Sequence, residues 1–249
     1  MSGHSKWATI KRKKAANDAR RGKLFAKLIR AVEVAARQGG ADPSSNPTLA
    51  TAIAKARANA VPMDNIDRAI ARATGGTEGA DFEEIWYEGY AASGVAVYVQ
   101  VLTDNRNRAA SEVRAAFTRN HGNLGEPGSV AYLFESKGYI EAEGDEDTIL
   151  NLALEAGAED VRGGGGGYEV ITAPSDLPAV EKALAGAQGV AVNNAEVTQL
   201  PKSSIPLDAG AAGKVLRLLD VLEDLDDVQA VYANYEIGDD LLAELAEAQ

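Results

Sequence analysis

The chain has 249 residues, of which 45% are hydrophobic and 25% are charged, the composition of an ordinary globular protein rather than a disordered or fibrous one. Its length exceeds the usual domain of roughly 100–150 residues, so we expect more than one domain. It has no cysteine, which excludes disulfides, thiolate metal sites and cysteine nucleophiles. There is no run of about 18 apolar residues, and the first residues are charged where a signal peptide would be apolar, so the sequence predicts a cytoplasmic protein with no membrane segment.

The net charge of −12 hides an uneven distribution along the chain. Residues 1–73 carry 15 Lys and Arg against 5 Asp and Glu, a net charge of +10. Residues 74–249 carry 10 basic and 32 acidic side chains, a net charge of −22. A separation of this size indicates two surfaces with different partners, and the basic surface suits a polyanion such as nucleic acid.

The N-terminal region is predicted to form a basic arm followed by three helices. Residues 2–16 show no apolar period and contain Lys and Arg but no acidic residue. The next segment has apolar side chains at helical spacing on one side and basic side chains on the other, which predicts an amphipathic helix. An N-cap followed by a first-turn proline opens the second helix, and a glycine pair ends the third. The predicted helices span 17–37, begin at Asn46–Pro47, and run from Pro62 to Gly75.

Beyond a linker at residues 74–80, the pattern alternates strands and helices. Segments rich in aromatic and β-branched residues predict strands, and Ser93–Gly94 joins the first two as a hairpin. The order is that of one βαββαβ unit inserted into another, which resumes near Ile205. The predicted strands lie at 85–90, 95–102, 132–134, 139–141, near Val161, at 168–172, 196–200 and 228–236, and the helices at 106–120, after Asp145, at 177–187 and 209–225.

Basic side chains in the first 37 residues are the strongest candidate for a binding site. Eleven Lys and Arg are opposed there by only Asp18 and Glu33. Cations held in line release counterions from a phosphate backbone, and this release supplies most sequence-independent affinity for nucleic acid. The alternative is a solvated helix face. The predicted nucleic-acid-binding residues are His4, Lys6, Trp7, Lys11, Arg12, Lys13, Lys14, Arg20, Arg21, Lys23, Lys27 and Arg30.

The mode of binding is less defined by the sequence. Trp7 lies between two lysines, where its ring is suited to stacking on a base, but Trp7 and Ile10 are equally suited to pinning the arm to the helices. The first two helices are separated by roughly ten residues, whereas a helix-turn-helix needs a turn of about 3–4. A conventional reader of the major groove is therefore not predicted, and recognition of RNA or DNA through shape and phosphates stays open.

A second contact surface is predicted in the α/β part. The segment TDNRNR at 103–108 stands at a strand end and helix start, where amides and two guanidiniums could hold an anion, although a turn that caps the helix is the simpler interpretation. The segment HGNLGEPGS at 121–129 has the glycines of a shaped loop. The predicted residues of this secondary surface are Asp104, Asn105, Arg106, Asn107, Arg108, Asn123 and Gly125.

Other motifs predict no chemistry. The glycine run at 163–167 lacks the Lys-Ser/Thr ending of a phosphate-binding loop and is interpreted as a flexible turn. The acidic residues at 223–227 are more typical of a solvated junction than of a magnesium site. With two histidines, His4 and His121, and no nucleophile, base and oxyanion donors in combination, the sequence predicts no catalytic residue, no metal and no cofactor. It leaves the oligomeric state open.

Several segments, in order along the whole chain, carry a resemblance to a known family: Gly3 to Trp7, Ile10–Lys11, Arg21 to Phe25, Asp42–Pro43, Tyr87 to Tyr90, TDNRNR at 103–108, Asn123 to Gly125 and Gly128 to Val130. On these segments the chain resembles the YebC/PmpR family. Two residues depart from the family pattern. Met63 stands where a lysine commonly follows the proline that opens the third helix, and His121 stands where glycine is common.

The resemblance implies an α+β multidomain fold, in which an N-terminal three-helix domain precedes two ferredoxin-like α+β domains, one inserted in the other. The corresponding domains are residues 1–76, residues 81–130 with 203–249, and the inserted, acidic residues 131–202. The resemblance also implies a non-enzymatic regulator of gene expression of a family described as transcriptional regulators that bind DNA. The alternative it implies is a translation factor that associates with ribosomal RNA or the ribosome and relieves stalling.

Overall fold

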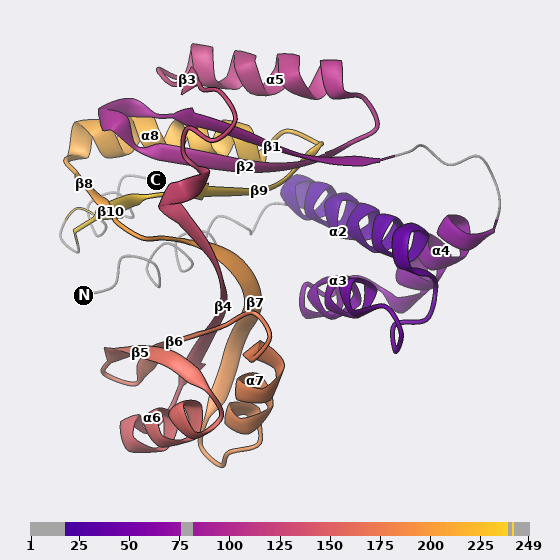
Figure 1. The fold of residues 1–249 in the computed structure, drawn as a ribbon, viewed down its shortest axis with the longest axis vertical. Helices are drawn as coiled ribbons and strands as arrows, with labels where there is room; N and C mark the ends of the chain where they lie inside the picture. The colour runs from indigo at the N-terminus through magenta and orange to yellow at the C-terminus, as the bar shows by residue number, and fades with distance from the viewer. Residues whose placement is uncertain (1–17, 76–81, 239–240, 242–249) are drawn as a thin grey trace. The chain divides into compact units, whose positions relative to one another are not determined.

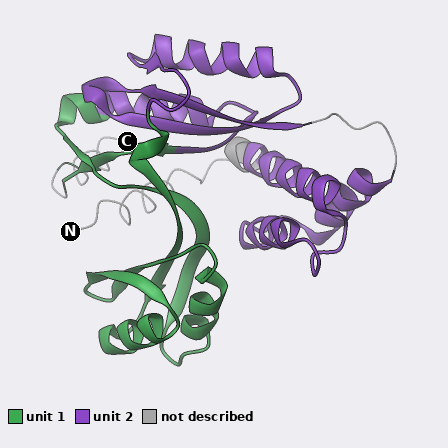
Figure 2. Ribbon diagram, in the orientation of Figure 1, with its two compact units in different colours: residues 1–12, 130–212, 232–249 green, residues 13–129, 213–231 purple. Residues whose placement is uncertain are grey.

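The computed structural model describes residues 18–75, 82–238 and 241 (Figure 1). The described chain forms two compact units (Figure 2). Of the described residues, one unit contains 130–212 with 232–238, and the other contains 18–75 and 82–129 together with 213–231. Helices come first and antiparallel sheets follow, so the predicted α+β multidomain class is confirmed. The proposed division into three domains stays a prediction.

The N-terminal helices form a small bundle around a buried apolar core. Leu28 and Val32 pack there against Leu49 and Ile66. Asn46 holds two helices at once, because its side chain accepts a hydrogen bond from the Leu49 amide at 3.1 Å and donates to the Ala35 carbonyl at 2.8 Å. The predicted N-cap is thus confirmed. The helices are α2 (Asp18–Gly39), α3 (Pro47–Ala58) and α4 (Met63–Thr74).

The first sheet has the strand order β3-β1-β2-β9, with β1 and β2 paired as the predicted antiparallel hairpin. Helix α5 buries Val113 and Phe117. A Cβ at Gly89 would lie 2.6 Å from the Phe117 ring, so this glycine lets the ring approach the strand. The elements are β1 (Glu83–Tyr90), β2 (Ala96–Thr103), α5 (Arg106–Arg119), β3 (Asn123–Leu124), α8 (Ala209–Glu223) and β9 (Val228–Ala233).

The second sheet belongs to the other unit and has the strand order β5-β6-β4-β7, entirely antiparallel. Its elements follow the order strand, helix, strand, strand, helix, strand, which with this strand order is the predicted ferredoxin-like arrangement. Ile140, Ile149 and Leu184 form its core. The elements are β4 (Phe134–Glu143), α6 (Glu146–Glu155), β5 (Ala158–Gly164), β6 (Gly167–Thr172), α7 (Leu177–Ala185) and β7 (Ala191–Pro201). A parallel pair, β8 (Ile205–Leu207) and β10 (Tyr235–Ile237), completes the unit.

The prediction of two short strands at 132–134 and 139–141 was wrong. A 3₁₀ turn covers Ala131–Leu133, and β4 then runs without interruption through Gly138. A Cβ at Gly138 would lie 2.1 Å from the Thr172 hydroxyl, so this glycine serves a close approach rather than a turn.

The other differences concern where strands begin and end. The strand expected at 196–200 begins earlier, at Ala191, because β7 pairs with almost the whole of β4. The strand expected at 228–236 is divided at Asn234, whose carbonyl accepts a hydrogen bond from the Ile205 amide at 2.8 Å. The glycine run forms a turn only at Gly165–Gly166, both at positive φ, between β5 and β6.

Within the described ranges, no helix is both long enough and apolar enough to span a bilayer.

Replacing Gly89 with alanine is expected to destabilise the unit that holds α5, because the added methyl group overlaps the Phe117 ring. The free energy of unfolding should fall by about 1–3 kcal/mol. Urea denaturation followed by Trp86 fluorescence, with Trp7 replaced by Phe to leave one tryptophan, measures the change. The matched control is Gly213→Ala in α8, where a Cβ meets no atom within 4 Å and stability should rise by about 0.5–1 kcal/mol. Equal stability of Gly89→Ala and the wild type would contradict the packing argument.

Candidate nucleic-acid interface

The predicted nucleic-acid-binding residues fall into two groups. His4, Lys6, Trp7, Lys11, Arg12, Lys13 and Lys14 lie outside the described residues, and Arg20 and Arg21 lie on α2 with side chains that the structure does not describe. The remaining three, Lys23, Lys27 and Arg30, share one face of α2.

These three cations contact the turn between α8 and β9 in the same compact unit. Lys23 donates to the Asp224 carbonyl at 3.1 Å, and Lys27 donates to the Glu223 carbonyl at 2.5 Å. Arg30 donates to the Asp226 carbonyl at 3.1 Å. Carbonyls at the end of a helix carry partial negative charge and need donors, so the lysine side chains act as a cap for α8.

Lys27 is partly buried in this contact. Burial lowers the pKa of its ammonium group to about 8, although the negative charges of Glu223, Asp224 and Asp226 oppose the shift. The Glu223 carbonyl occupies one of the three donors of this ammonium group. The sequence could not show this, because Lys27 and Glu223 are 196 positions apart.

Asp227 is the centre of the contact between α2 and the sheet of its unit. Its side chain is 5% exposed and accepts hydrogen bonds from Arg30 at 2.9 Å, Arg108 at 2.7 Å and the Thr103 hydroxyl at 2.8 Å. Burial disfavours the charged carboxylate, but the hydrogen bonds from Arg108 and Thr103 and the charges of Arg108 and Arg30 outweigh it and hold the pKa of Asp227 below its ordinary value. The carboxylate therefore stays ionised and organises three segments.

The TDNRNR segment is built around the same carboxylate. Asn105 caps α5 by accepting a hydrogen bond from the Arg108 amide at 3.0 Å. Arg108 also pairs with Asp104 at 2.8 Å, and Arg106 lies 3.5 Å from Glu83. Asn107 is exposed beside them. The described contacts favour the capping interpretation, since both guanidiniums already face carboxylates. An anion site at this turn stays a prediction.

A buried glutamate shapes the glycine-rich loop. Glu88 in β1 is 6% exposed, and its carboxylate accepts a hydrogen bond from the Gly128 amide at 2.7 Å, while its carbonyl accepts one from the Gly125 amide at 2.8 Å. Asn123 pairs with Tyr90 at the edge of the sheet. His121 adopts φ +60°, a region that glycine enters more easily. The loop amides thus serve the fold, a role for Glu88 that sequence reasoning missed.

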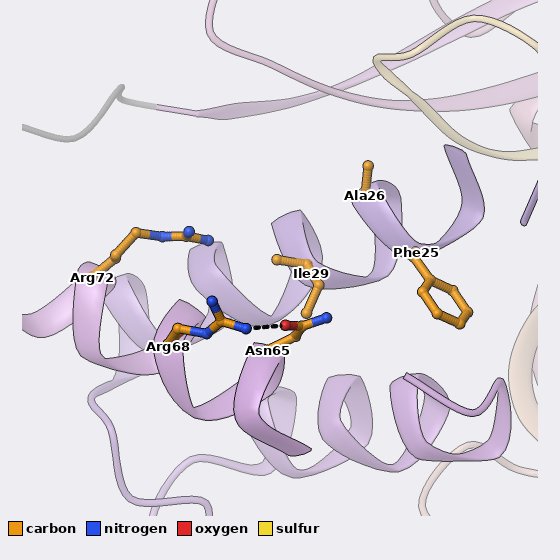
Figure 3. Close-up of a pocket in the computed structure, with 6 residues that line it drawn as sticks. All are labelled: Phe25, Ala26, Ile29, Asn65, Arg68 and Arg72. Carbon is orange, nitrogen blue, oxygen red and sulfur yellow. Dashed lines mark hydrogen bonds between the residues drawn. The ribbon is translucent and has the colours of Figure 1, made fainter. Parts of the chain in front are cut away.

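Sequence reasoning also missed a shallow groove of about 270 Å³ in the helical bundle (Figure 3). Helix α2 supplies apolar side chains and α4 supplies polar and cationic ones. The available signal was the i, i+4 spacing of two arginines on α4, which places them on one face. The lining residues are Phe25, Ala26, Ile29, Asn65, Arg68 and Arg72.

Two family models match successive parts of the chain. The family model described as the TACO1/YebC protein N-terminal domain matches residues 5–76, and the model described as the TACO1/YebC second and third domain matches residues 82–235. The chain belongs to the TACO1/YebC family. The first model covers the basic helices, and the second covers both sheets.

Relatives extend the match over the full chain. A protein of Saccharopolyspora erythraea is 57% identical over 98% of this chain and 99% of its own length, and one of Acidothermus cellulolyticus is 57% identical over 98% and 100%. Each is named "Probable transcriptional regulatory protein". The crystal structure of a conserved hypothetical protein from Aquifex aeolicus is 50% identical, with a TM-score of 0.79 over 89% of this chain and 93% of that one.

Replacing Asp227 with asparagine should lower the free energy of unfolding by about 1–3 kcal/mol at pH 7, because it removes a buried charge from two arginines. The pKa of Asp227 is lower in the folded state than in the unfolded state, where it is about 3.9. The stabilisation by the carboxylate is therefore complete above the unfolded-state pKa and is lost as pH falls through the folded-state pKa. The wild type and the variant should therefore converge in acid, as measured by urea denaturation across pH.

The control for this substitution is Asp104→Asn, which removes an exposed partner of the same arginine. Its effect should stay below about 1 kcal/mol, as for other exposed ion pairs. A larger loss in Asp104→Asn than in Asp227→Asn would show that the buried carboxylate is not the organising group.

Proposed function

We propose that this protein is a regulator of gene expression that binds nucleic acid through its basic N-terminal region. The observation that carries the proposal is the charge boundary: residues 1–73 carry a net charge of +10, and the matched N-terminal family domain covers residues 5–76. A cationic domain joined to an acidic body can bind a polyanion while the body stays away from it. The regulatory role is supported by the name that the relatives carry.

Two sets of cations have different parts in this proposal. Lys11, Arg12, Lys13 and Lys14 follow one another in the basic arm, with no acidic residue among residues 2–16. The α2 cations instead donate to carbonyls of the α8–β9 turn, and Lys27 and Arg30 are partly buried there, so they offer phosphate fewer donors than an exposed cation does. We therefore propose that the arm supplies most of the phosphate contacts. No catalytic step, metal or cofactor is part of the proposal.

DNA is the target that transcriptional regulation suggests, and ribosomal RNA is the second candidate. Two observations favour RNA. The net charge of −22 beyond residue 73 would be repelled by a long duplex lying within a Debye length of about 8 Å. The connection between Gly39 and Pro47 is also longer than the turn of about 3–4 residues in a helix-turn-helix, so α2 and α3 do not form that reader of a major groove.

Replacing Lys11, Arg12, Lys13 and Lys14 with alanine should weaken binding and reduce its dependence on salt. If about six phosphates are contacted, the slope of log K against log salt is near −5 for duplex DNA, and removing four contacts brings it near −2. Fluorescence anisotropy from 50 to 300 mM KCl measures both quantities.

The control in this experiment is Lys23→Gln with Lys27→Gln. Because these lysines are occupied by carbonyls, the slope should change by less than about 1. If the arm variant keeps the wild-type slope and affinity, the arm is not the binding element. If the control flattens the slope as much as the arm variant does, the α2 lysines exchange their carbonyl partners for phosphate.

For an RNA target on the ribosome, part of the protein should co-sediment with ribosomal particles from a DNase-treated lysate. Moderate salt should release it, since screened phosphate contacts weaken steeply with salt. Deletion of residues 1–16 should abolish the co-sedimentation. A wild type that stays wholly in the supernatant and prefers discrete promoter sites about 10³-fold over random duplex would support the DNA candidate instead.

A further inference from the structure

We infer that the groove between α2 and α4 binds one unstacked nucleotide of single-stranded RNA. This inference rests on the proposed function and specifies the form of nucleic acid that the helical bundle recognises. Figure 3 shows Asn65, Arg68 and Arg72 in sequence along α4, with Ile29 of α2 next to Asn65 and Phe25 of α2 farther along, beyond Asn65.

The lining of the groove combines an apolar side with a cationic side. On α2, Phe25, Ala26 and Ile29 share one face by helical spacing. On α4, the i, i+3 and i+7 positions bring Asn65, Arg68 and Arg72 to the facing side. A nucleotide has the same two parts, because its base has apolar faces and its phosphate carries charge. Bases stack on aromatic rings and guanidinium planes, and guanidiniums bind phosphate by paired hydrogen bonds.

The two arginines are held beside the groove by their neighbours. Arg68 donates to the Asp64 carbonyl at 2.9 Å and to the Asn65 side-chain oxygen, and neither acceptor carries a charge. Arg68 is therefore positioned without being neutralised by these contacts. Arg72 pairs with Glu33 at 3.2 Å while its side chain stays 58% exposed. A phosphate at the rim can approach both guanidiniums.

Asn65 favours RNA over DNA in this site. A guanidinium has donors only, so the Asn65 atom that faces Arg68 must be the carbonyl oxygen. The amide NH₂ group then points away from Arg68 (Figure 3). It is a donor available to a base edge or to the 2′-hydroxyl that distinguishes ribose from deoxyribose.

The size of the groove favours an unpaired nucleotide over a base pair. About 270 Å³ is slightly less than the roughly 300–1,000 Å³ of pockets that enclose a drug-sized ligand, so it fits part of one nucleotide. A base inside a duplex is stacked on both faces and cannot enter. Sequence-specific recognition of RNA commonly uses such splayed bases in loops and single strands.

The α2 residues that line the groove and the α2 residues that contact the α8–β9 turn lie on different sides of the helix. At about 100° per residue, the mean direction of Phe25, Ala26 and Ile29 lies roughly 120° from that of Lys23, Lys27 and Arg30. A nucleotide in the groove therefore does not displace the contacts of Asp227. The groove explains how the bundle binds RNA while those α2 cations keep their carbonyl partners.

The test compares three fluorescein-labelled 12-nucleotide probes of one sequence on the full chain: single-stranded RNA, single-stranded DNA and duplex RNA. Phe25→Leu retains an apolar side chain but removes the ring, and should weaken binding of single-stranded RNA about tenfold, within the range for one base–aromatic stack. Binding of duplex RNA should change less than about twofold, because phosphate contacts dominate there. Wild-type affinity should follow the order single-stranded RNA, single-stranded DNA, duplex RNA. Circular dichroism and thermal melting check that the variant is folded.

A second pair of variants tests the rim independently of packing. Arg68→Gln with Arg72→Gln changes exposed side chains and should lower the salt slope for single-stranded RNA by about 1.4, which corresponds to two phosphate contacts. The matched control is Arg57→Gln with Lys55→Gln on α3, two exposed cations that do not line the groove. The control should change affinity for single-stranded RNA less than about threefold, as expected for general electrostatics.

The outcomes separate this inference from the proposed function. A wild type that binds none of the three probes, and no duplex DNA of the same sequence, overturns the proposed function. If the wild type binds RNA and Phe25→Leu binds it equally tightly, only the nucleotide site is overturned. The same holds if both groove variants lose single-stranded and duplex binding equally. If an acidic peptide with an apolar side chain displaces the RNA while the groove variants keep their affinity for RNA, the nucleotide site is also overturned. Selective loss of single-stranded RNA in both groove variants supports it.

Discussion

The carboxylate of Asp227 joins three parts of the chain. It accepts hydrogen bonds from Arg30 of α2, from Arg108 at the start of α5 and from Thr103 at the end of β2. A buried carboxylate is costly unless its lone pairs are satisfied, and here two guanidiniums and a hydroxyl satisfy them. The cap of α5, the end of β2 and the orientation of α2 in this unit are therefore coupled through one charge.

The requirement that buried polar groups find partners also explains why basic side chains in this protein bind both carboxylates and backbone carbonyls. A helix C-terminus leaves carbonyls without donors, and Lys23 and Lys27 supply donors to α8. Glu88 performs the converse task, since its carboxylate and carbonyl accept hydrogen bonds from amides of the glycine-rich loop. Charged side chains that suggest ligand binding in a sequence can thus be consumed by backbone groups that the fold leaves unpaired. In the proposed function, nucleic acid is therefore bound mainly by cations outside these contacts.

Family membership and site geometry contribute different information here. The match over residues 5–76 and 82–235 establishes the family, and the names of the relatives suggest regulation. A fold or family does not itself specify the chemistry of a site. The groove with Phe25 and Arg68 supplies a physical basis for choosing between single-stranded and duplex targets, because stacking needs an unpaired base and phosphate attraction does not.

Local features were predictable from the sequence because their causes lie within a few residues. Asn46 and Asp145 were expected to begin helices, and each accepts a hydrogen bond from an amide three positions later. The order of helices and strands along the chain was also predictable, since it follows from the period of the apolar residues and the placement of turns. The charge boundary near residue 73 needs nothing but the sequence.

Features that depend on distant segments were decided only by the tertiary structure. Gly138 resembled a turn residue, yet it lies inside β4 because Thr172 approaches its backbone. Lys27 looked free for phosphate, yet its partner Glu223 is 196 positions away. The pattern of a helix shows which side chains share a face but not what that face will meet. The sequence by itself therefore determined the elements, their order and the charges that they carry, and packing decided which of those charges the protein uses internally, because burial forces each polar group to find a partner wherever the chain provides one.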